Sequence, residues 1–221
     1  MNLQSTDPSI LQAEALAELA SPAATRIKVL EAQLEDSTTD TERIDLLKQL
    51  SSTWYEAQQF GLAGYQAEQI AELNPTGETW AIAGTTYAIG IKNASKTKEQ
   101  LFCKEKALEC LEKAASLEPE VVSHQLNRGI LLAENPPADN PMKGVQLLLQ
   151  LNKKHPQNVR VINNIAKFAL QTGQLDKAEQ RLLGAISIEP NNKRSHCLLA
   201  ELYSAKDDIA SYKKHLNICE S

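Results

Sequence analysis

The sequence predicts an all-α fold: a solenoid of about five stacked helical hairpins, preceded by two helices that cap its N-terminal end. Aromatic residues make up only 5% of the chain, and the plentiful Ala, Leu, Glu, Gln and Lys favour helices over strands. A proline ends similar segments, among them "AASLEP" and "AISIEP", at Pro75, Pro119, Pro156 and Pro190. A small residue precedes each proline by 12 positions, at Ala63, Ala107, Gly144 and Ala178. Because small side chains let two helices approach closely, this recurrence indicates repeated hairpins that share one core.

The totals limit the class of protein. With 221 residues and 42% hydrophobic content, the chain is large enough to bury a continuous core. A net charge of -5 argues against a general nucleic-acid binder, which needs an excess of basic residues to displace counterions. The start "MNLQSTDPSILQ" lacks the features of a signal peptide, and no apolar run is long enough to span a bilayer. We therefore expect a cytoplasmic protein without direct membrane insertion, or a periplasmic one if an upstream anchor or signal is missing from this chain.

Residues 1–38 are expected to form a capping segment, and residues 39–221 the repeat array. The stretches "PSILQAEALAELA" and "SPAATRIKVLEAQLED" each predict a helix, the second with Pro22 in its first turn. These helices fit no complete repeat, so they are predicted to cap the first hairpin. Thr39 followed by Glu42 has the spacing of a capping box and marks the start of the first repeat helix.

A second set of small residues recurs in the first helix of each predicted hairpin, and a mostly bulky residue follows three positions later. The small residues are Ser51, Gly84, Gly129, Ala166 and Ala200. The residues that follow them are Trp54, Tyr87, Leu132, Ala169 and Tyr203. A period near 34 residues with these positions and a closing proline resembles the tetratricopeptide repeat, abbreviated TPR. The resemblance implies a right-handed superhelix with repeats at about 44–76, 77–121, 122–158, 159–192 and 193–220.

Two repeats depart from the common length. The second spans 39 residues from Trp80 to Pro119, about 11 more than the family pattern, and the extra turns are predicted to lengthen both helices. The third contains the turn "ENPPADNPMKG", which Pro136, Pro137 and Pro141 should stiffen. A long second repeat followed by this turn also resembles a group of bacterial TPR proteins related to cytochrome c assembly factors, some of them tethered to the inner membrane. The last helix, in "DDIASYKKHLNICES", has the polar outer face of an end cap.

The residues that could carry chemistry do not form the pattern of a known kind of site. None of the four cysteines belongs to a C-x-x-C pair, and we expect all four to be small, buried side chains in a reducing compartment. Cys103 and Cys110 are expected to share one buried stripe. His215 and Cys219 could share a helix face, but no group has the spacing of a zinc site, and no glycine-rich phosphate loop is present. The sequence therefore predicts no catalytic residue, no metal, no cofactor and no enzyme activity.

In the TPR family the first helix of each hairpin lines a concave groove that binds a partner, and the resemblance assigns groove residues by position. They are Lys48, Ser52, Tyr55, Thr85, Leu126, Ile130, Arg160, Asn163, Lys167, Arg194 and Glu201. Chaperone-binding members clamp a carboxylate with a fixed set of Lys, Asn and Arg positions, of which only Lys48 is matched here. Basic residues instead gather in the last repeats, which predicts a protein or peptide ligand with an apolar anchor and an acidic or carboxylate end. The alternative is that these charges form an ordinary solvated surface.

Three functions are compatible with this sequence. The first is a non-catalytic scaffold that binds a partner protein or peptide in its groove. The second is a self-associating structural protein, in which helix 8–20 or a second copy of the chain fills the groove and a homo-oligomer forms. The third, implied by the cytochrome c assembly resemblance, is an assembly or chaperone factor for a bacterial membrane or periplasmic complex. In each case affinity depends on a few contacts rather than on the repeat frame.

Overall fold

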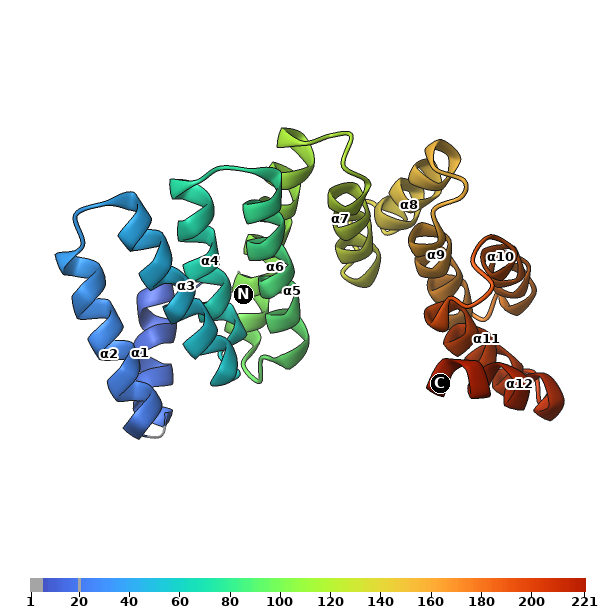
Figure 1. Ribbon diagram of the computed structural model, residues 1–221, viewed down its shortest axis with the longest axis horizontal. Coiled ribbons are helices and arrows are strands. Elements are labelled where there is room, and N and C mark those ends of the chain that lie inside the picture. Colours follow the sequence, from blue (N-terminus) through green and yellow to red (C-terminus); the bar gives the residue numbers. More distant parts are fainter. Residues whose placement is uncertain (1–5, 20) are drawn as a thin grey trace. The chain divides into compact units, whose positions relative to one another are not determined.

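The computed structural model describes residues 6–19 and 21–221, and these residues form twelve α-helices and no strand (Figure 1). The all-α prediction is therefore confirmed. Residues 1–5 of the expected capping segment, and Ala20, lie outside the described residues. None of the described helices is long and apolar enough to cross a membrane.

Two leading helices are followed by five helical hairpins, in the order that the sequence predicts. The leading helices are α1 (Pro8–Glu18) and α2 (Ser21–Asp36). The first two hairpins are α3 (Asp40–Glu56) with α4 (Phe60–Leu73), and α5 (Gly77–Asn93) with α6 (Thr97–Leu117). The other three are α7 (Val122–Glu134) with α8 (Lys143–Lys154), α9 (Val159–Gln171) with α10 (Leu175–Ile188), and α11 (Lys193–Ala205) with α12 (Ile209–Glu220).

Contacts divide the chain into two compact units, Met1–Leu131 and Leu132–Ser221. We call them the N-terminal unit and the C-terminal unit. The division falls inside α7. Each unit has hydrophobic clusters of its own, and each is described by itself.

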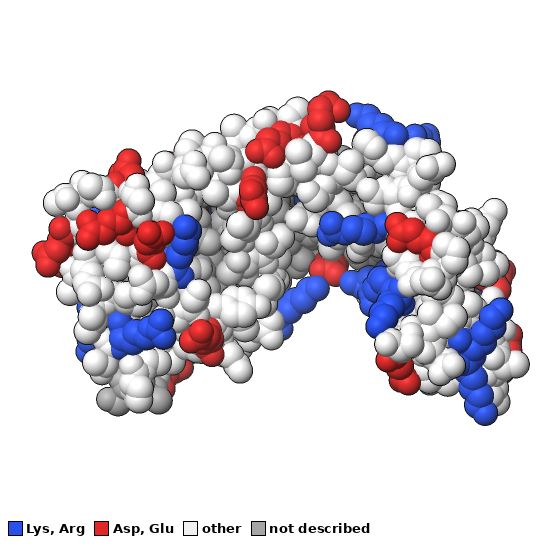
Figure 2. All heavy atoms as spheres, in the orientation of Figure 1, with Lys and Arg blue, Asp and Glu red and all other residues white. Residues whose placement is uncertain are grey.

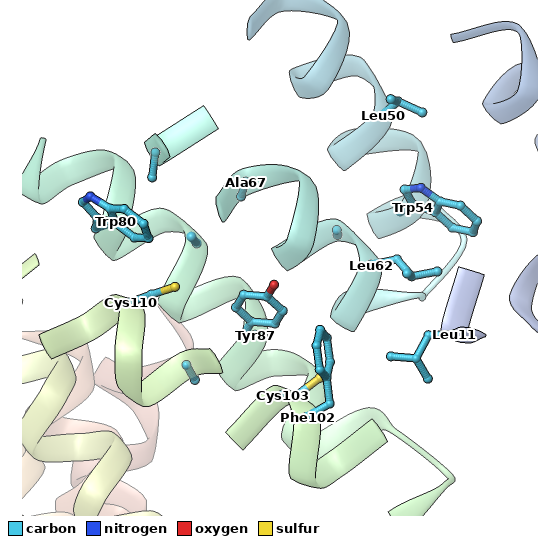
Figure 3. Packing of buried hydrophobic residues seen from close by; sticks show 14 of the residues in the cluster. Leu11, Leu50, Trp54, Leu62, Ala67, Trp80, Tyr87, Phe102, Cys103 and Cys110 are labelled. Carbon is cyan, nitrogen blue, oxygen red and sulfur yellow. The ribbon is translucent and has the colours of Figure 1, made fainter. Parts of the chain in front are cut away.

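The N-terminal unit packs around large side chains that its helices bury completely (Figure 3). Trp54 of α3, Tyr87 of α5 and Phe102 of α6 are each at most 1% exposed and belong to one cluster. Leu11 of α1 and Ile27 of α2 belong to the same cluster, so both leading helices bury apolar side chains together with the first repeats. The bulky positions predicted at Trp54 and Tyr87 are thus core residues.

Small residues allow the helices of this unit to approach closely. At Gly84 of α5, an added Cβ would lie only 2.7 Å from Leu111 Cγ of α6, too close for any larger residue without movement of the neighbour. Ala63 and Ala107, which lie 12 positions before their closing prolines, are fully buried. The prediction that these small residues mark contacts between helices is confirmed.

A buried carboxylate joins the first repeat to the second. Tyr87 of α5 donates its hydroxyl to Glu68 Oε2 of α4 at 2.7 Å, and Lys106 Nζ of α6 lies 3.0 Å from Glu68 Oε1. Glu68 is only 5% exposed, so both partners are needed to offset the cost of burying its charge. Burial, together with the negative charge of Glu68, raises the pKa of Tyr87, which keeps its hydroxyl protonated as a donor.

The second hairpin is longer than the others, as the sequence predicts. α5 has 17 residues and α6 has 21, compared with 13 for α9 and 14 for α10. The turn between α5 and α6 forms ion pairs with α1. Lys96 Nζ lies 3.1 Å from Glu14 Oε2 and 3.2 Å from Glu18 Oε1, and Lys98 also pairs with Glu14. α1 also packs on α4, so this leading helix is tied to the second helices of the first two hairpins.

In the C-terminal unit, local signals set the ends of α9. Asn158 caps its start by accepting a hydrogen bond from the Val161 N–H at 3.1 Å. Gly173 follows its last turn with a φ of +72°, a left-handed conformation that costs glycine little. Gly144 brings α8 against α7, because an added Cβ would lie 2.1 Å from the Ala133 nitrogen. The predicted role of Gly144 as a contact between helices is confirmed.

A disulfide joins Cys197 of α11 to Cys219 of α12, with their Cα atoms 4.9 Å apart. The prediction that all four cysteines are reduced is therefore wrong for this pair. The two residues are 22 positions apart, and the hairpin turn between them brings the start of α11 opposite the end of α12. Cys103 and Cys110 are free and fully buried, as predicted.

Candidate partner-binding groove

In each unit the predicted groove residues lie on the first helices of the hairpins. On α3, the side chains of Lys48, Ser52 and Tyr55 are exposed, Tyr55 to 47%. The Tyr55 ring packs edge-on against Phe60 with the ring centroids 5.0 Å apart. Lys48 pairs with Asp45 at 3.3 Å, but both partners are largely exposed, so this pair is weak and leaves Lys48 available.

Groove positions further along the N-terminal unit are covered. Thr85 of α5 is half-buried, and its hydroxyl donates to the Ala81 carbonyl at 2.8 Å. Ile130 of α7 is half-buried, and Leu126 is 1% exposed. Leu126 is therefore a core residue and does not line an open surface, which corrects its assignment. The exposed apolar side chain of α5 is Ile82, at 52%, a position that the family pattern does not assign to the groove.

Two assigned residues of α9 already have partners within the C-terminal unit. Asn163 is 4% exposed, accepts a hydrogen bond from the Ser195 hydroxyl at 2.9 Å and donates to Asn192 Oδ1 at 3.3 Å. It therefore ties α9 to the start of α11 and is not open to a partner, which corrects its assignment. Lys167 Nζ lies 2.8 Å from Glu134 Oε1, and both side chains are partly buried.

Arg160 of α9 and Arg194 of α11 are exposed, and so is Glu201 of α11. Neither guanidinium forms a hydrogen bond or an ion pair with any residue that the structure describes. Basic side chains are prominent over the C-terminal unit on the face shown in Figure 2. The first helices of this unit therefore carry two unpaired arginines in consecutive repeats.

His215, which shares α12 with Cys219, forms a buried pair with His196 of α11. His196 Nε2 lies 2.8 Å from the Pro190 carbonyl, which can only accept, so this nitrogen carries the proton. When His196 carries only this proton, its Nδ1 accepts from His215 Nδ1–H; the two Nδ1 atoms are 2.8 Å apart, and Tyr203 stacks on His215. Burial lowers the pKa of His215, and a positive charge on His196 or Lys214 acts in the same direction. Within the described part of the chain, no three His, Cys, Asp or Glu residues are grouped to hold a metal ion.

Residues 140–202 match the family model of the tetratricopeptide repeat. This segment of the chain is a tetratricopeptide-repeat region. The same fold occurs in TTC0263, a thermophilic TPR protein of Thermus thermophilus, which is 20% identical and superimposes with a TM-score of 0.58 over 88% of this chain and 94% of that one. A MamA fragment from Desulfovibrio magneticus is 16% identical, with a TM-score of 0.51 over 80% of this chain and 93% of that one.

A further MamA structure is 17% identical, with a TM-score of 0.52 over 77% of this chain and 95% of that one. At such low identities the likeness shows the fold alone. No curated protein sequence matches the chain. The TPR family match and the fold together describe a helical solenoid of the kind that serves as a protein-interaction scaffold.

Proposed function

We propose that this TPR protein is a non-catalytic scaffold that binds a partner segment with an acidic or carboxylate end along α9 and α11. The observation that carries the proposal is the pair of exposed, unpaired arginines, Arg160 and Arg194, on the first helices of consecutive repeats. A guanidinium donates two parallel hydrogen bonds to one carboxylate, so such positions suit an anionic partner.

The neighbouring side chains support this binding face. The hydrogen bonds of Asn163 to Ser195 and Asn192 connect the two helices that carry the arginines, which holds the arginines in a defined relation. Lys167 is already neutralised by Glu134, so it is expected to contribute less than either arginine. Leu170, half-buried near the end of α9, offers an apolar contact.

Charge reversal tests the proposal. The double variant Arg160→Glu, Arg194→Glu should lose the partners that the wild-type chain captures from extracts of its own host, since two attractive contacts become repulsive. The matched control is Lys213→Glu, Lys214→Glu on α12, which makes the same change in net charge at exposed residues of another helix. Equal capture by wild type and the arginine variant, with the fold intact by circular dichroism, would reject the proposal.

The disulfide supports a second proposal: the chain works in an oxidising compartment such as the periplasm. This location would suit an assembly or chaperone factor for a periplasmic complex. Disulfides persist in such compartments, whereas cytosolic thiols are kept reduced. Cys197–Cys219 is the pair concerned. Burial raises the pKa of Cys103 and of Cys110 to about 12, so these thiols are largely protonated, unreactive and protected from oxidation.

Differential alkylation in the native host tests this proposal. Cells are quenched with acid, and the denatured protein is treated with a maleimide before and after reduction. We expect Cys103 and Cys110 to react without reductant, which makes them the internal control, and Cys197 and Cys219 to react only after reduction. Reaction of Cys197 and Cys219 before reduction would place the chain in a reducing compartment.

A further inference from the structure

The C-terminal unit contains an open apolar cleft that the sequence does not indicate. Its floor is formed by Ile165, Phe168 and Ala169 of α9, and one wall by Val145 and Leu149 of α8. α8 and α10 both pack on α9 (Figure 1). The cleft is lined by residues of all three helices, and we call it the α8–α10 cleft. Its volume is about 370 Å³, enough for a large apolar side chain.

The cleft and the predicted groove lie on different faces of α9. Successive residues of a helix are rotated by about 100°, which places Arg160 and Lys167 on one face. The same periodicity places Ile165 and Ala169 about half a turn away from them, and Phe168 about a quarter turn away. Phe168 therefore lies between the two faces, with Lys167 Nζ 5.7 Å from its ring centroid. The cleft is therefore a second surface, and an inference about it goes beyond the proposed function.

Two cations on α10 border the cleft, Lys177 and Arg181, and none of the described residues that line it is acidic. Lys177 Nζ donates to Gln174 Oε1 at 2.9 Å. The Arg181 guanidinium forms no hydrogen bond or ion pair with any described residue. The border of the cleft is thus positively charged and is not neutralised by the protein itself.

The acidic residues of α10 are directed elsewhere. Asp176 and Glu179 lie 2.8 Å and 2.6 Å from Lys206 Nζ, at the end of α11. Their hydrogen bonds to Lys206 lower the pKa of both carboxyls, so both remain charged and paired near neutral pH. α10 therefore presents anions toward α11 and cations toward the cleft.

The entrance of the cleft is adaptable. Met142, which precedes α8, lines it and is 54% exposed. Its unbranched thioether can adjust to the shape of an apolar partner group. The contact of Gly144 with α7 fixes the start of α8 directly beside this methionine. An adaptable entrance over a rigid floor suits recognition of an apolar side chain.

We propose that the α8–α10 cleft binds an amphipathic helix of a partner protein, which inserts an apolar side chain over Phe168 and presents two acidic residues to Lys177 and Arg181. The two cations are four residues apart on α10, which sets their Cβ atoms about 6 Å from each other. Acidic residues one turn apart on a partner helix have the same spacing. Apolar burial supplies the affinity, and the charges select an acidic partner over a basic one.

The test uses a synthetic helical peptide with leucine anchors and two glutamates one turn apart, added to the full chain. The chain contains only two methionines, Met1 and Met142, so the Met142 methyl resonance is a direct probe of the cleft. The glutamate peptide should shift this resonance, and the matched peptide with two lysines should not. The variant Lys177→Glu, Arg181→Glu should bind the glutamate peptide about tenfold more weakly and should now bind the lysine peptide.

Two controls separate this surface from the groove. In Lys213→Glu, Lys214→Glu and in Arg160→Glu, Arg194→Glu, the glutamate peptide should shift the Met142 resonance as it does in wild type, whatever these changes do to partner capture. The proposal is wrong if the peptide leaves the Met142 resonance unmoved, or if reversal at Lys177 and Arg181 does not alter the preference. It is also wrong if the resonance shifts with protein concentration alone, because a second copy of this chain would then occupy the cleft.

Discussion

Gly144 and Gly184 are both helical glycines of the C-terminal unit, yet their surroundings are opposite. A Cβ added at Gly144 would lie 2.1 Å from the Ala133 nitrogen, a backbone atom that cannot move aside by itself. A Cβ added at Gly184 of α10 would meet nothing within 4 Å. The first glycine is required by packing, and the second only weakens its helix.

The two glycines should therefore respond to alanine with opposite signs. Gly144→Ala forces α8 away from α7 and should lower the free energy of unfolding by about 1–3 kcal/mol. Gly184→Ala should raise it by about 0.5–1 kcal/mol, because alanine is the better helix former and no atom obstructs it. Urea denaturation of both variants measures the difference, and equal shifts would show that the contact of α8 with α7 is wrong.

His215 should make stability depend on pH. Burial lowers its pKa in the folded state, so the folded chain binds fewer protons than the unfolded chain as the pH falls below about 6.5. This contribution to stability is complete above that pH and is lost as the pH falls toward the folded pKa. His215→Gln keeps a donor for His196 but does not titrate. Its urea midpoint should fall less than that of wild type between about pH 7.5 and about pH 5.5. If the urea midpoint of the variant fell as much as that of wild type over this range, groups other than His215 would cause the pH dependence.

At the scale of the helices, the disulfide closes the last hairpin. Cys197 and Cys219 are 22 positions apart, and a cross-link over such a loop restricts the unfolded chain by about 3 kcal/mol in the chain-entropy model. Cys197→Ser, Cys219→Ser should therefore unfold at a clearly lower urea concentration than the oxidised wild type. Reduced wild type is the control: it should behave like the variant, and a stable variant would contradict the stabilising role of the bond.

The order and the ends of the helices could be predicted because their signals are local. Thr39 accepts a hydrogen bond from the Glu42 N–H as its spacing predicts, and Gly173 ends α9. The exposure of a groove position is not local, because it depends on which neighbouring helix covers it. Leu126 and Asn163 occupy family groove positions and are nevertheless buried. The disulfide escaped prediction for the same reason, since no sequence pattern shows which helix faces meet.

At the scale of the molecule, the two units contain different spectroscopic probes. Both tryptophans, Trp54 and Trp80, belong to the N-terminal unit, whereas the disulfide belongs to the C-terminal unit. Repeat proteins are stabilised mainly by neighbouring contacts, so a change at one end acts locally. Reduction should therefore lower the midpoint followed by circular dichroism but leave the midpoint followed by tryptophan fluorescence unchanged. A common shift in both signals would show one cooperative transition.

The α8–α10 cleft could not be anticipated from the repeat frame. The family pattern assigns partner-binding positions to the groove face of α9 only. It gives Ile165, Phe168 and Ala169, which form the floor of the cleft, only a packing role. The signal that could have found it is the absence of acidic residues around Lys177 and Arg181 on one side of α10, together with the proline-rich turn before α8. Neither feature has meaning until the path of α8 is known.

The bond between Tyr87 and Glu68 also limits how this chain can be engineered. Repeats of a solenoid are often treated as interchangeable modules, but here the second repeat carries a hydroxyl and a lysine that exist to satisfy a carboxylate in the first. Replacement of the second repeat by a consensus repeat would leave the buried carboxylate of Glu68 without its partners. Replacement of the first would leave Tyr87 and Lys106 without theirs. These two repeats should therefore be grafted only as a pair.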